Sequence, residues 1–89
     1  MKEIEIAGIK FRVNDNYTAK LWEWNNKHII YFNDPRISRR NPASAPGSYD
    51  LITRSLHLNP RLGKFWTIVG NTISHKVAGE EISVIGERK

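Results

Sequence analysis

Hydrophobic and polar residues alternate along much of this chain, with the period of two that is typical of half-buried β-strands. The alternation runs over residues 3–6 and resumes over 9–13, with Ala7-Gly8 between the two runs. A two-residue turn there predicts a hairpin with one apolar face and with opposite charges paired on the other face. The predicted pairs are Ile6 with Ile9, Ile4 with Phe11, Glu5 with Lys10 and Glu3 with Arg12. A slip of one residue would bury charges, so this register is strongly specified.

A second hairpin is predicted over residues 19–32, with its turn in Asn25-Asn26-Lys27, because asparagine tolerates positive φ. The length of the loop decides which side chains share a face, and the pattern leaves two lengths open. A two-residue loop groups Trp22, Trp24, Ile29 and Tyr31 on one face. A three-residue loop instead groups both tryptophans with Ile30 and Phe32.

The C-terminal third reads as a β-meander with turns at Gly70-Asn71 and Ala78-Gly79. The first turn pairs Trp66 with His75, and the second would pair His75 with Ile82. The same alternation predicts a shared inner face, composed of Trp66, Ile68, Ile73, His75, Val77, Ile82 and Val84.

The middle of the chain is less regular. Residues 33–49 are predicted to form a long, basic, Pro/Ser-rich loop, because three prolines prevent regular strand hydrogen bonding and a long helix there. Residues 50–58 suit a short helix or a strand equally well. With up to eight candidate strands, the chain is predicted to be a single, mostly β domain over residues 1–89. Its antiparallel hairpins would form a small barrel or a two-sheet sandwich.

Composition narrows the class of protein. The chain has no cysteine, which favours a reducing, cytoplasmic setting and removes thiolate chemistry. Its longest uninterrupted apolar stretch spans residues 29–32, so no membrane helix is expected. The three histidines lack metal-ligand spacing, and no phosphate-binding glycine loop is present, so no metal and no cofactor are predicted.

Charge gives the strongest pointer to a partner. The net charge is +5, and the segment from residue 36 to residue 64 accounts for all of it, with six bases and one acid. Arginine presents a planar fork of donors that suits phosphate, so this segment predicts contacts with nucleic acid or with an acidic protein surface. The plainer reading is a solvated surface. The candidate binding residues here are Arg36, Arg39, Arg40, Arg54, Arg61 and Lys64.

The aromatic residues Trp22, Trp24 and Tyr31 have two possible roles. They could form a platform on which unpaired bases stack. The plainer reading, and the one expected here, is that they fill the core, since a domain of this size needs large side chains inside.

The leading functional hypothesis is a small nucleic-acid-binding β-domain that contacts phosphates through residues 36–64. The first alternative is a protein-interaction module or an inhibitor of an enzyme that processes nucleic acid. The second is a small ribonuclease with His57 or His75 as general base and Arg54 beside the phosphate. Because nothing in the sequence brings these groups together, no catalytic residue is assigned and a non-enzymatic role is favoured.

Overall fold

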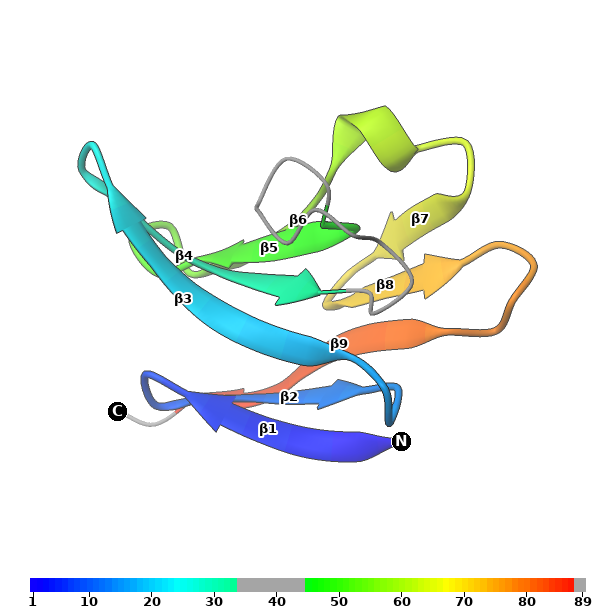
Figure 1. Ribbon diagram of the computed structural model, residues 1–89, viewed down its shortest axis with the longest axis horizontal. Helices are drawn as coiled ribbons and strands as arrows, with labels where there is room; N and C mark the ends of the chain where they lie inside the picture. Colours follow the sequence, from blue (N-terminus) through cyan, green and yellow to red (C-terminus); the bar gives the residue numbers. More distant parts are fainter. Residues whose placement is uncertain (34–44, 88–89) are drawn as a thin grey trace.

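The computed structural model describes residues 1–33 and 45–87, which fold into two stacked antiparallel sheets (Figure 1). Sheet A has the spatial order β1 (Lys2–Ile6), β2 (Ile9–Val13), β9 (Glu81–Glu87), β8 (Thr72–His75) and β7 (Trp66–Val69). Sheet B has the order β3 (Thr18–Trp24), β4 (Lys27–Asn33), β5 (Gly47–Asp50) and β6 (Ser55–Leu58). A short 3-10 helix, η1 (Pro60–Leu62), connects β6 to β7.

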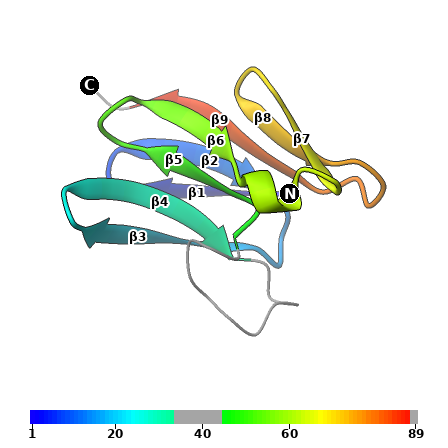
Figure 2. The ribbon, with the colours of Figure 1, turned by 90° about the horizontal axis from the view of Figure 1, so that it is seen from above.

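The edges of the two sheets lie close together, because β1 approaches β3 and β6 approaches β7. Among the described strands, however, no ladder joins one sheet to the other, so the fold is a two-sheet sandwich and not a closed barrel. Figure 2 shows the layers from above. Within residues 1–33 and 45–87, no helix has the length and apolarity that crossing a bilayer requires.

The first hairpin has the predicted turn and register. Glu5 lies opposite Lys10 and Glu3 lies opposite Arg12. Both turn residues have positive φ, at 52° for Ala7 and 81° for Gly8. This is the backbone that a two-residue hairpin turn requires if its twist is to match the flanking strands.

The second hairpin adopts the two-residue alternative. Trp22 pairs with Ile29 and Trp24 with Lys27. The turn residues Asn25 and Asn26 have φ of 51° and 64°, which asparagine accepts more readily than other L residues do.

In the meander, the Gly70-Asn71 turn is as predicted, and Trp66 pairs with His75. The predicted Ala78-Gly79 turn is wrong, because Ile73 pairs with Ile82 and the connection spans residues 76–80. The wider loop closes on His75, whose Nδ1 accepts hydrogen bonds from the backbone N–H of Val77 at 3.2 Å and of Ala78 at 2.9 Å. The register shift is two residues, so the inner face is preserved except at Val77, which is exposed.

Residues 50–58 contain no α-helix. The segment is a turn over residues 51–54 followed by β6, and the turn begins at Asp50, whose Oδ1 accepts from the N–H groups of Ile52 and Thr53. Such a side-chain bond to the backbone two residues ahead favours a turn over a helix. The predicted loop over 33–49 is also shorter than expected at both ends, since β4 includes Asn33 and β5 begins at Gly47. Residues 34–44 lie outside the described part.

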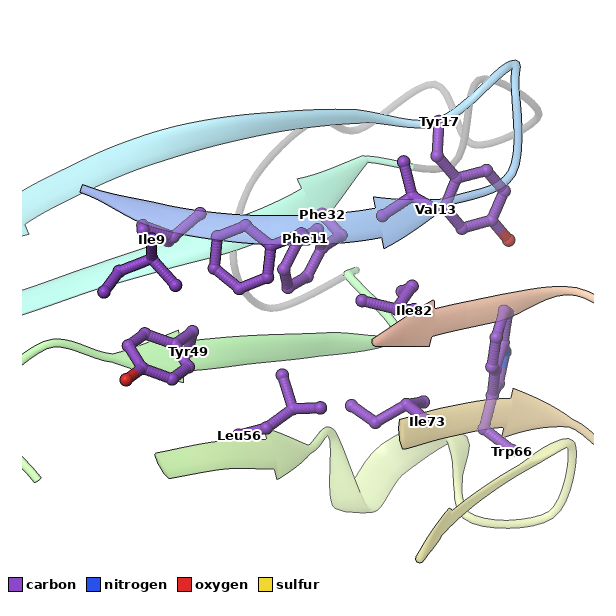
Figure 3. Packing of buried hydrophobic residues seen from close by; sticks show 11 residues of the cluster. Ile9, Phe11, Val13, Tyr17, Phe32, Tyr49, Leu56, Trp66, Ile73 and Ile82 are labelled. Carbon is purple, nitrogen blue, oxygen red and sulfur yellow. The ribbon is translucent and has the colours of Figure 1, made fainter. Parts of the chain in front are cut away.

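The core lies between the sheets, with side chains from both layers pointing toward one another (Figure 3). Phe11 of sheet A makes edge-to-face contacts with Phe32 at 5.0 Å and with Tyr49 at 5.6 Å. β5 approaches β8 so closely that a Cβ at Gly47 would overlap the Ile73 side chain and lie 2.9 Å from the carbonyl oxygen of His57. These contacts leave the opposite face of sheet B free of the core.

Candidate nucleic-acid interface

The candidate interface is the outer face of sheet B, meaning the face turned away from sheet A. Alternation along the strands and the cross-strand pairing define its members. β3 and β4 contribute most of the large side chains, and β5 and β6 contribute small polar ones. The outer face contains Lys20, Trp22, Trp24, Lys27, Ile29, Tyr31, Ser48, Asp50, Ser55 and His57.

Two tryptophans stand on this face in contact with solvent. Trp22 is 37% exposed and Trp24 is 66% exposed, so the expectation that they fill the core is wrong. The reason is the turn at Asn25 and Asn26, because a two-residue loop sends Ile30 and Phe32 inward and their neighbours outward. The tryptophan of the core is Trp66, which is 5% exposed.

Tyr31 shares the outer face but is buried, with 1% of its surface exposed. The stacking hypothesis is therefore wrong for Tyr31, because a buried ring cannot stack on a base. The ring of Trp22 lies nearly perpendicular to the Tyr31 ring, with centroids 6.2 Å apart and an interplanar angle of 77°. This edge-to-face contact holds Trp22 against a fixed neighbour, so Tyr31 has a positioning role here.

Cations flank the tryptophans. Lys20 and Lys27 belong to the outer face and are exposed. Sequence reasoning did not single out these two lysines, although the two-residue loop, once chosen, places them beside Trp22 and Trp24. Among the described residues, the one carboxylate of the outer face is Asp50, whose Oδ1 already accepts two backbone N–H groups. The outer face of sheet B is therefore positive and aromatic.

Arg54 joins this region from the β5–β6 turn. That turn lies beside the β3–β4 hairpin, because the N–H of Leu51 donates to the carbonyl oxygen of His28 at 2.9 Å. Arg54 is exposed and has a φ of 55°, a left-handed conformation that strongly favours glycine or asparagine.

The rest of the basic segment is divided. Arg36, Arg39 and Arg40 lie outside the described residues. Arg61 and Lys64 are exposed, but they follow β6 and Arg54 precedes it, so they lie at the opposite end of that strand (Figure 1, Figure 2). Within residues 1–33 and 45–87, these three cations form no ion pair with a carboxylate. Their charge remains available to a partner.

The two candidate general bases do not meet. His57 is on the outer face, where its Nε2 is hydrogen-bonded to the Ser55 hydroxyl at 2.9 Å, and that hydroxyl is bonded to Thr53 at 2.7 Å. His75 belongs to sheet A, where its ring stacks on Phe65 and its Nδ1 closes the 76–80 turn. The described part of the chain contains no group of three histidine, aspartate or glutamate side chains arranged to hold a metal ion.

Comparison with protein-family models, with curated proteins and with solved structures found no match to this chain. The class that the fold itself defines is a small antiparallel β-sandwich. Its functional candidate is the cationic, aromatic outer face of sheet B.

Proposed function

We propose that this protein is a nucleic-acid-binding domain of the cytoplasm. Disulfides do not persist in that reducing compartment, and this chain has no cysteine with which to form one. The observation that most supports this proposal is that Trp22 and Trp24 are exposed on a sheet face, with Lys20 and Lys27 beside them. The basic segment from residue 36 to residue 64, with Arg54 beside the same face, supplies further phosphate contacts.

Each part of this surface has a known physical role in binding nucleic acid. Lysine and arginine neutralise phosphates and release condensed counterions, which gives an affinity that falls as salt rises. Exposed indole rings stack on bases without regard to sequence. A purely solvating surface would explain the cations, but not two large aromatic side chains left in water beside them.

The test measures fluorescence anisotropy of labelled oligonucleotides over a range of salt concentrations. Lys20→Gln/Lys27→Gln should reduce the slope of log affinity against log salt by about 1.4 to 1.8, for two lost phosphate contacts. Lys10→Gln/Arg12→Gln is the matched control, because it removes the same charge from exposed positions on sheet A. Equal losses in the two variants, or no binding by the unaltered protein at low salt, would refute the proposal.

A second candidate function is a protein-interaction module, including an inhibitor that meets an acidic surface. The observation that favours it is apolar exposure near the same hairpin, at Leu21 and at Ile52 in the β5–β6 turn. A stoichiometric protein complex that survives nuclease treatment would support this function. A complex that disappears on nuclease treatment would support nucleic-acid binding.

A further inference from the structure

We infer that the nucleic acid bound by this domain is single-stranded, and that it crosses the outer face of sheet B from β3 to β6. The inference rests on the proposed function and adds the form of the ligand and its path. Bases would stack on Trp22 and Trp24 at one edge of the sheet. The sugar-phosphate backbone would continue toward the polar side chains of β5 and β6.

The tryptophans require an open strand. Trp22 and Trp24 are two residues apart on one strand, so their Cα atoms are separated by about 7 Å. That is roughly twice the 3.4 Å spacing of stacked bases in one strand of a duplex. A base can stack on an indole only when a face of that base is free, and in a duplex both faces are covered by neighbouring bases.

The indole rings of Trp22 and Trp24 differ in how far the fold orders them before a base binds. The ring of Trp22 packs nearly perpendicular to the buried ring of Tyr31, so Trp22 loses little freedom when a base arrives. Trp24 lies at the end of β3 and is 66% exposed, so it has the larger free surface to cover. Together they form a partly ordered platform at the β3 edge.

At the β6 edge, the outer face presents side chains of the kinds that contact phosphate. Thr53, Ser55 and His57 form a continuous chain of hydroxyl and imidazole hydrogen bonds that runs from the β5–β6 turn into β6. Arg54 lies in the turn directly before β6 and adds a positive charge. Hydroxyl groups and arginine side chains are common phosphate contacts.

The dimensions agree with a short binding site. Three strand spacings separate β3 from β6, which is about 14 Å at the usual distance between neighbouring strands. A strand of two or three unstacked nucleotides covers that width. The exposed side chains of this face lie at its two edges, on β3 with the adjoining start of β4 and on β6 with its turn, and Tyr31 between them is buried. A strand that lies across the face would therefore contact it at those two edges.

The experiment compares a 12-nucleotide oligo(dT), an oligo(U) of equal length and the oligo(dT)·oligo(dA) duplex, each labelled for anisotropy. Both single strands should bind more tightly than the duplex and should quench tryptophan fluorescence. Trp24→Leu should weaken single-strand binding about 5- to 150-fold, which corresponds to 1–3 kcal/mol per stacked base. Phe65→Leu is the control, since Phe65 is an exposed aromatic residue whose ring stacks on His75 of sheet A.

The path is tested by Ser55→Ala/His57→Ala, which should weaken single-strand binding several-fold, with Ser83→Ala on sheet A as its control. Circular dichroism should show that each variant keeps the sheet content of the unaltered protein. Duplex binding as tight as single-strand binding, without quenching, would overturn the inference and leave nucleic-acid binding intact. If Ser55→Ala/His57→Ala binds single strands as tightly as the unaltered protein does, the proposed path is wrong. Binding to none of the three probes would overturn the proposed function itself.

Discussion

At the scale of single residues, two side chains occupy backbone conformations that do not suit them. Ala7 and Arg54 have φ of 52° and 55° and are both exposed. The left-handed conformation costs an L residue other than asparagine or aspartate about 1–2 kcal/mol relative to helical backbone. Ala7 sits in a hairpin turn with no evident ligand contact, whereas Arg54 adjoins the outer face of sheet B.

Replacing each with asparagine separates strain from function. Ala7→Asn and Arg54→Asn should each raise the free energy of unfolding by about 0.5–1 kcal/mol, measured by urea denaturation. Arg54→Asn should also weaken nucleic-acid binding, whereas Ala7→Asn should not change it. Because both variants are expected to be more stable, lost affinity could not come from unfolding. Unchanged affinity in Arg54→Asn would remove Arg54 from the interface.

Gly47 is the residue on which the packing of the two sheets depends most visibly. An added methyl group would overlap the Ile73 side chain, so Gly47→Ala should lower the free energy of unfolding by about 1–3 kcal/mol. Gly86→Ala is the control, because its Cβ would lie 4.0 Å from the Cβ of Lys10 and meet nothing closer. Similar stabilities for the two variants in urea denaturation would contradict the close approach of β5 and β8.

At the scale of secondary-structure elements, the loop of residues 76–80 depends on one imidazole. His75→Ala removes the acceptor for two backbone N–H groups, so the free energy of unfolding should fall by about 1–2 kcal/mol. His57→Ala should change it by less than about 0.5 kcal/mol, because the bonds of His57 are to an exposed hydroxyl. Thermal denaturation of the two variants makes the comparison, and equal melting temperatures would argue against a stabilising role for the His75 hydrogen bonds in the 76–80 loop.

The elements that sequence analysis predicted are those whose turns are encoded by the turn residues themselves. Ala7-Gly8 and Gly70-Asn71 fix both a loop length and a register, and the structure confirms both pairings. The 76–80 loop was missed because a side chain reaching forward to the backbone sets its width. β5 was missed because Pro46 directly precedes it, so the strand was read as the end of a loop.

The candidate site was only partly predictable for a related reason. Whether Trp22 and Trp24 face the core or solvent depends on one residue of loop length at Asn25-Asn26, and composition cannot decide that. Tyr31 was grouped with them correctly by face, yet it is buried. Face follows from alternation along one strand, whereas burial depends on neighbours that are distant in the sequence.

At the scale of the whole molecule, the two sheets have different surfaces. The exposed face of the β1–β2 hairpin in sheet A pairs lysine and arginine with glutamate across its strands. The outer face of sheet B has two lysines and exposed tryptophans around a single carboxylate among its described residues. One side of the sandwich is thus internally neutralised, and the other is left with charge and aromatic surface for a partner.

The most direct measurement uses the three tryptophans of the chain as internal probes. The indole N–H signals would be followed by ¹⁵N–¹H NMR while oligo(dT) is added to saturation. The signals of the exposed Trp22 and Trp24 should shift, whereas the signal of the buried Trp66 should stay in place. Saturable binding that leaves Trp22 and Trp24 unmoved would show that the nucleic acid lies elsewhere on the molecule.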